Sequence, residues 1–169
     1  MLSINADVEC HLVHQKRADA ARAKDVDVSN CFKILGIAPR YDIDLDELNK
    51  AYISLQTRCH PDVSGDDNES MHVNHAYKIL SDPIKRAEHL LEISGRWQHA
   101  GSEDIDDLFD DIEKLQEGTP LEQLEAKNRL KQHLNRIYDE LRVLFSNDVD
   151  VKMICQKINK AKYVKKFLR

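Results

Sequence analysis

The amino-acid sequence predicts an all-α protein, with an amino-terminal helical domain and a carboxy-terminal antiparallel three-helix bundle. Apolar residues recur at spacings of three and four along most of the chain, which is typical of amphipathic helices. No segment shows the alternation of polar and apolar residues that marks a strand. Only five of the 169 residues are Gly and four are Pro, while 41% are apolar and 33% charged, which is the profile of a helix-rich globular protein.

Four short helices are predicted in the first half of the chain. Ser29 or Asn30 caps the first helix, and Gly36 ends it. Asp44 caps the second helix, and Glu47 three residues later completes a capping box. The predicted spans are residues 31–35, about 44–59, about 71–80, and 83 to near 95.

The second and third helices are separated by the polar run HPDVSGDDN at residues 60–68. Its proline and glycine cannot continue either helix, so the pattern predicts a helical hairpin with His60, Pro61 and Asp62 at the tip. A polar triad held outward on a rigid hairpin suggests docking onto a partner rather than catalysis. The alternative is an ordinary polar turn.

Asp82 and Pro83 start the fourth helix of the first domain, and residues 96–104 form a polar linker. The rest of the chain is predicted to form the bundle. Beyond the linker, the breaks at residues 118–120 and 146–148 divide the chain into three helical segments. Short connections make an antiparallel arrangement of these helices the expected one.

Composition excludes several classes of protein. No apolar run approaches the roughly 20 residues that span a bilayer, so no membrane-spanning helix is expected. A net charge of −5 disfavours a general nucleic-acid binder. The four cysteines form no CxxC pair, which fits a reducing compartment. Residues 1–28 lack a secretory signal and are too acidic for a typical mitochondrial presequence, so a flexible or loosely helical extension is predicted there.

Two groups of side chains invite a metal-site interpretation. His72 and His75 are three residues apart but lack a third ligand of matching spacing, so we interpret them as surface histidines. Cys10, His11 and His14 form a slightly better cluster, but the paired CxxC motifs of a zinc module are absent. We therefore predict no metal site and no cofactor.

Cys59 next to His60 could suggest a nucleophile and its base. Adjacent side chains on a helix point in different directions, however, and such a pair cannot readily exchange a proton. The sequence therefore predicts no catalytic residue.

The motifs together resemble a J domain. They comprise Phe32, Leu35-Gly36-Ile37, Cys59-His60-Pro61-Asp62 and the run NHAYKILSDP at residues 74–83. The continuation RAEHLL at residues 86–91 makes the chain similar to the HscB family, called Jac in yeast mitochondria, of J-type co-chaperones of iron–sulfur cluster assembly. That family joins a J domain to a three-helix bundle. The resemblance covers about residues 30–169 and implies a J domain at 29–95, a linker at 96–104 and a scaffold-binding bundle at 105–169, preceded by the extension at 1–28.

The resemblance implies a non-enzymatic protein that binds a 70-kDa heat-shock chaperone of the HscA type and stimulates its ATPase. The Asp62 carboxylate suits a charge-assisted hydrogen bond with an arginine of that chaperone. Lys50 and Arg58 would add cationic contacts, the alternative being ordinary solvated charges. Val63 stands where many J domains have a lysine, so we expect weak, salt-sensitive chaperone binding.

The resemblance also implies that the bundle binds the iron–sulfur scaffold protein IscU. In the family's scaffold-binding surface, the apolar positions correspond to Leu108, Phe109 and Ile112. The polar positions correspond to Glu113 and Gln116, and the aromatic position to Tyr163. The alternative for the apolar members is simple bundle core, which is how residues at helical spacing usually behave.

A rival function is a general J-domain co-chaperone for unfolded clients. The Gly/Phe-rich linker and the zinc-binding cysteines common in that class are absent from this sequence. The expected compartment is the bacterial cytoplasm, with the mitochondrial matrix as the alternative.

Overall fold

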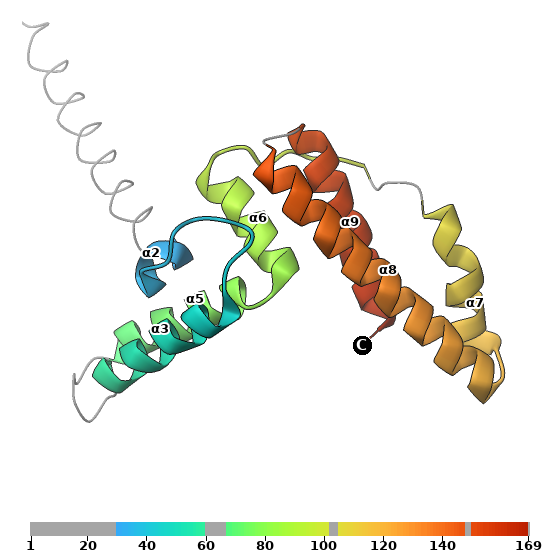
Figure 1. The fold of residues 1–169 in the computed structure, drawn as a ribbon, viewed down its shortest axis with the longest axis horizontal. Coiled ribbons are helices and arrows are strands. Elements are labelled where there is room, and N and C mark those ends of the chain that lie inside the picture. The colour runs from blue at the N-terminus through green and yellow to red at the C-terminus, as the bar shows by residue number, and fades with distance from the viewer. Residues whose placement is uncertain (1–29, 60–66, 102–104, 148–149, 169) are drawn as a thin grey trace, which may run out of the picture. The chain divides into compact units, whose positions relative to one another are not determined.

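The computed structural model describes residues 30–59, 67–101, 105–147 and 150–168, and within them all regular structure is helical (Figure 1). The all-α fold class is therefore confirmed. The predictions for residues 1–28 and for His60, Pro61 and Asp62 lie outside the described residues. The elements are α2 (Cys31–Leu35), α3 (Leu45–Arg58), α5 (Asp67–Leu80), α6 (Pro83–Ile93), the 3-10 helix η1 (Asp106–Leu108), α7 (Phe109–Glu117), α8 (Pro120–Ser146) and α9 (Val151–Phe167).

Local capping explains where the first helices begin and end. Asn30 caps α2, and Gly36 ends it with a φ of 67°, a left-handed conformation that glycine adopts without strain. The Asp44 carboxylate accepts a hydrogen bond of 2.8 Å from the Asp46 amide at the start of α3. Asp82 caps α6 in the same way. These helix starts follow the predicted ones.

Two predicted details are wrong. Among the described residues Glu47 makes no capping-box hydrogen bond, and its carboxylate lies 3.5 Å from the Arg40 guanidinium. The helix α5 begins at Asp67, so Asp67 and Asn68 belong to the helix and not to the loop. The first turn of α5 is polar and adds no residue to the apolar stripe. The spacing of apolar residues therefore predicts a helix start near Met71, which is too late.

The chain divides into two compact units, and this division differs from the predicted domain limits. Among the described residues, the first unit holds 30–38, 48–59 and 67–78, and the second holds 39–47 together with everything from 79 onward. The helix α6 thus belongs with the bundle. Its apolar face, including Ile84 and Leu91, is buried in the bundle core, and α6 packs against α9.

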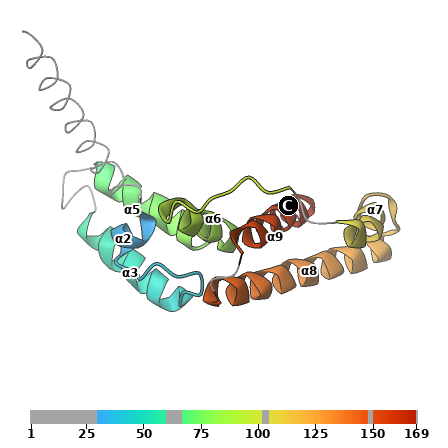
Figure 2. The ribbon, with the colours of Figure 1, turned by 90° about the horizontal axis from the view of Figure 1, so that it is seen from above.

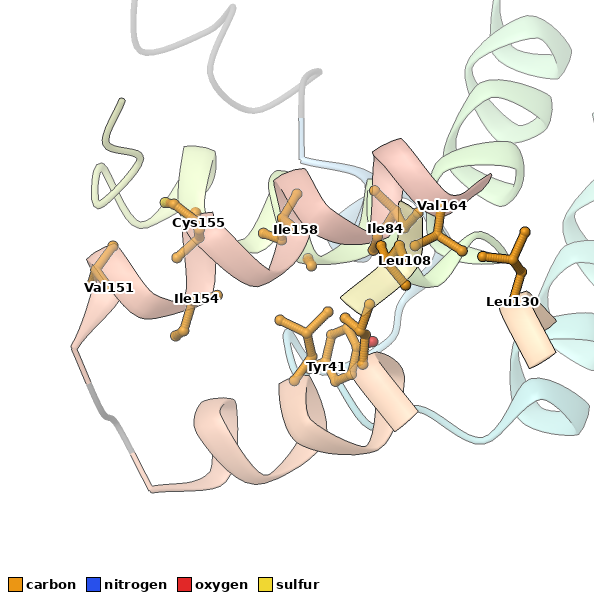
Figure 3. Close-up of a cluster of buried hydrophobic side chains, with 14 of the residues drawn as sticks. Tyr41, Ile84, Leu108, Leu130, Val151, Ile154, Cys155, Ile158 and Val164 are labelled. Carbon is orange, nitrogen blue, oxygen red and sulfur yellow. The ribbon is translucent and has the colours of Figure 1, made fainter. Parts of the chain in front are cut away.

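The second unit is a bundle extended by α6. Figure 2 shows α7 along the first part of α8 and α9 along the rest, in agreement with their contacts. Part of its core appears in Figure 3, where α9 supplies much of the apolar surface. The labelled members are Tyr41, Ile84, Leu108, Leu130, Val151, Ile154, Cys155, Ile158 and Val164.

Part of the segment predicted as a polar linker contacts α9. The Asn159 side chain donates a hydrogen bond of 2.9 Å to the carbonyl oxygen of Ala100. The Lys162 ammonium group lies 5.8 Å from the centre of the Trp97 ring, within range of a cation–π contact. Residues 97–100 therefore pack as part of the second unit.

None of the described helices is long and apolar enough to cross a membrane.

Candidate docking surfaces

The predicted chaperone site is described only at its flanks. His60, Pro61 and Asp62 lie outside the described residues, so their placement stays a prediction. Lys50 and Arg58 are both exposed on α3, where a partner could reach them. Their predicted role in chaperone contact also stays a prediction.

The two helices that flank this tip are joined by a polar clasp, formed by Asn49, Tyr52 and Gln56 of α3 with Asn74 and Tyr77 of α5. The Tyr52 hydroxyl and the Gln56 amide each donate a hydrogen bond of 2.8 Å to the Asn74 side-chain oxygen. Tyr77 donates one of 2.6 Å to Asn49. The rings of Tyr52 and Tyr77 stack with centroids 4.2 Å apart. The pairs run in opposite directions along the chain, so α3 and α5 are antiparallel, as predicted.

This clasp was not predicted, although part of its signal was present. Tyr52 and Tyr77 fall on the apolar stripes of their helices, a pattern that by itself reports only the helices. Asn49 and Gln56 lie three and four residues from Tyr52, on the same face of α3. A polar residue on each side of a tyrosine indicated that its hydroxyl would find a partner.

Cys59 closes α3 as a buried residue, 2% exposed. Burial raises the pKa of its thiol, and the Glu69 side chain raises it further. A thiol with a raised pKa stays protonated and is a poor nucleophile at neutral pH. In this setting Cys59 contributes apolar packing.

The structure separates the residues predicted to bind the scaffold. Leu108 is fully buried and Ile112 is 8% exposed, so both belong to the bundle core, and the core alternative describes them. Phe109 is 53% exposed. Glu113 and Gln116 are exposed too, and their spacing of four and seven residues from Phe109 puts all three on one side of α7. For this trio, scaffold contact stays a prediction.

Tyr163 lies partly buried on α9. Its ring meets that of Phe167 edge-on, with centroids 5.2 Å apart, and packs against the bundle core. The remaining exposure leaves its predicted aromatic contact untested.

A partly buried ion pair links α7 to α8. Asp111 is 7% exposed, and its carboxylate accepts a hydrogen bond of 2.6 Å from the Arg129 guanidinium on α8. The neighbouring acids Asp106, Asp110 and Glu117 are exposed. Phe109 therefore projects from a helix whose outer surface is rich in carboxylates. Such a surface suits a partner that presents an apolar pocket bordered by cations.

Metal-binding geometry is absent from the part of the chain that the structure describes, where no three His, Cys, Asp or Glu side chains are grouped to hold an ion. His72 and His75 are exposed on α5. Cys10, His11 and His14 lie outside the described residues.

Comparisons with known proteins match this arrangement. Residues 30–89 match the family model of the DnaJ domain. The chain is 27% identical over 161 residues to a co-chaperone protein HscB homolog of Vibrio vulnificus, covering 81% of this chain and 91% of the relative. Among solved structures, chaperone HscB from Vibrio cholerae aligns with a TM-score of 0.68 at 19% identity, covering 82% of this chain and 93% of that one. Human co-chaperone protein HscB aligns with a TM-score of 0.69 at 23% identity, covering 80% and 77%.

The DnaJ match includes the clasped antiparallel helices α3 and α5, so residues 30–89 resemble a J domain. The relative that covers 81% of this chain, together with the shared fold, supports an HscB-type J-domain co-chaperone. These comparisons support the resemblance to HscB co-chaperones that the sequence shows.

Proposed function

We propose that this protein stimulates the ATPase of a specialised 70-kDa heat-shock chaperone of the HscA type and delivers the iron–sulfur scaffold protein IscU to it. The observation that carries this proposal is the presence, in one chain, of a DnaJ match at residues 30–89 and a separate helix, α7, that exposes Phe109 among carboxylates. One surface serves the chaperone and the other serves the scaffold.

The chaperone surface centres on Asp62. A carboxylate there can form a charge-assisted hydrogen bond with an arginine, which is stronger than a neutral bond. Lys50 and Arg58 are exposed on the adjoining helix and add charge attraction that speeds encounter more than it fixes affinity. The clasp between α3 and α5 supports this surface, because it sets the register of the helices that lead into and out of the tip.

The scaffold surface centres on Phe109. Exposed aromatic residues are frequent anchors of protein interfaces, and Glu113 and Gln116 supply polar contacts on the same side of α7. Leu108 and Ile112 act indirectly, because their burial fixes the rotation of α7 that turns Phe109 outward. The protein itself carries out no chemistry in this proposal. It works without a cofactor, in the bacterial cytoplasm or alternatively in the mitochondrial matrix.

The experiment that tests the proposal measures steady-state ATP hydrolysis by the cognate chaperone with this protein and the scaffold added. Wild-type protein is expected to raise the rate, and Asp62→Asn to abolish the increase. Asp66→Asn makes the same charge change a few residues further along and should leave the increase intact. Absence of stimulation by the wild type, or full stimulation by Asp62→Asn, contradicts the proposal. Suppression of aggregation of an unrelated client without scaffold binding would instead indicate a general J-domain co-chaperone.

A further inference from the structure

A cavity of about 280 Å³ lies between α6 and α9, and we call it the lysine cavity. Four of its seven lining residues are lysines, two are acids and one is apolar. They are Asp82, Ile84, Lys85, Glu88, Lys162, Lys165 and Lys166. The excess of cations stands out in a chain whose net charge is −5.

Both acids of the lysine cavity are already neutralised. One oxygen of the Asp82 carboxylate accepts a hydrogen bond of 3.0 Å from the Ile84 amide, and the other accepts one of 2.6 Å from the Lys165 ammonium group. Partial burial acts to raise the pKa of Asp82, but Lys165 and the backbone amides outweigh it and lower that pKa. Glu88 forms an ion pair with Lys162. Neither acid can therefore serve another lysine well.

Two of the four lysines are not paired with these acids. The ammonium groups of Lys85 and Lys166 have no anionic partner among the described residues, and both line the cavity. Lys166 lies in the last turn of α9, where the helix dipole favours a cation. The buried side chain of Ile84 forms one wall, which reduces screening by water compared with a flat surface. An anion placed there would meet two unsatisfied positive charges.

We propose that the lysine cavity binds neighbouring carboxylates of an acidic segment of a protein partner. A phosphate group fits less well, because the amides at the start of α6 that could hold it are occupied by the Asp82 carboxylate. A nucleic acid is disfavoured by the acidic pI of about 5.9, since a long polyanion would be repelled by the rest of the surface. Lysines act as point charges that single carboxylates can satisfy.

The test uses a dye-labelled hexaglutamate peptide and fluorescence anisotropy with the full-length protein at low ionic strength. Wild-type protein is expected to bind the peptide, more weakly as salt is added. The double variant Lys85→Gln/Lys166→Gln should raise the dissociation constant about fivefold or more. The control Lys131→Gln/Lys152→Gln removes the same charge from exposed positions outside the cavity, and should change it less than about twofold.

Three results would overturn the inference: no binding of hexaglutamate, equal losses in the two double variants, or tighter binding of a single-stranded oligonucleotide through the same lysines. Amide chemical-shift changes in the wild type locate the bound peptide without any substitution, and they must centre on α6 and the end of α9. The assay contains neither chaperone nor scaffold, so its outcome is independent of the proposed function.

Discussion

The hydroxyl group of Tyr77 on α5 donates a hydrogen bond of 2.6 Å to the Asn49 side chain on α3. This bond joins the two helices that flank the predicted chaperone-binding tip. With the bonds to Asn74, it holds the helices in one register, because a shift of either helix would break them together. The register of α3 against α5 thus depends on side chains that lie well inside the two helices.

Replacing Tyr77 with phenylalanine removes this hydrogen bond and keeps the ring that stacks on Tyr52. We expect the free energy of unfolding to fall by about 1 kcal/mol, the usual net contribution of such a bond. Urea denaturation of the full chain measures the change. His75→Ala, an exposed substitution on the same helix, serves as the control. Equal stability of Tyr77→Phe and wild type would show that the bond does not stabilise the helix pair.

Phe109→Ala should weaken binding of the scaffold protein about tenfold or more, because it removes the aromatic anchor from α7. Leu121→Ala is the matched control, since Leu121 is 64% exposed on α8 and is no part of the proposed surface. Both side chains are exposed, so neither variant should lose much stability. Calorimetric titration with the scaffold gives the affinities, and equal affinities for the two variants would remove Phe109 from the interface.

Tyr41→Phe should stabilise the protein. The Tyr41 hydroxyl is buried and has no hydrogen-bond partner among the described residues, so removing it relieves the cost of burying a polar group. The ring keeps its stacking on Phe145, with centroids 5.0 Å apart. We expect a gain of about 1 kcal/mol in the free energy of unfolding at neutral pH. A loss of similar size would show that the hydroxyl is satisfied.

Tyr41 should also make the stability of the protein depend on pH in the alkaline range. Burial raises the pKa of Tyr41 from 10.0 to about 12, with the charge of Arg86 opposing it. Because the folded state holds the phenol proton more tightly than the unfolded state, ionisation of Tyr41 does not affect wild-type stability below pH 10. The free energy of unfolding falls as the pH rises from 10 toward 12. Tyr41→Phe lacks this loss. Unfolding measured across that range should show the gap between the two proteins widening with pH, and a constant gap contradicts the assignment.

Asp82→Asn should produce a stability change that depends on pH. The pKa of Asp82 is lowered in the folded state, so its carboxylate stabilises the fold above the ordinary value of 3.8. That contribution is lost as the pH falls through the lower, folded-state pKa. Asparagine still caps α6 but cannot pair with Lys165 as an anion. Denaturation at neutral and acidic pH should show the difference from wild type shrinking below 3.8, whereas a difference that grows in acid would reverse the sign.

Features set by neighbouring residues were predictable from the sequence, and those set by distant ones were not. Asn30, Gly36 and Asp82 cap their helices as predicted, because capping involves residues only a few positions apart. The membership of α6 in the second unit depends on packing against α9, some seventy residues further on, and no local pattern reports it.

The candidate site shows the same limit. Leu108, Phe109 and Ile112 all fall at apolar places of the family pattern, yet Leu108 and Ile112 are buried while Phe109 is exposed. Consecutive residues point about 100° apart on a helix, so the packing of α7 on α8 decides which of them faces solvent. The lysine cavity could not be predicted from the sequence either, because its walls come from two helices that were not predicted to be neighbours.

The central claim is that one chain couples a scaffold to an ATP-consuming chaperone through two separate surfaces. Its most direct test is the steady-state ATPase rate of the chaperone, with and without scaffold, for wild type, Asp62→Asn and Phe109→Ala. We expect Asp62→Asn to lose all stimulation, and Phe109→Ala to keep the stimulation seen without scaffold while losing the increment that scaffold adds. Loss of both components in Phe109→Ala, or retention of either in Asp62→Asn, would contradict the two-surface account.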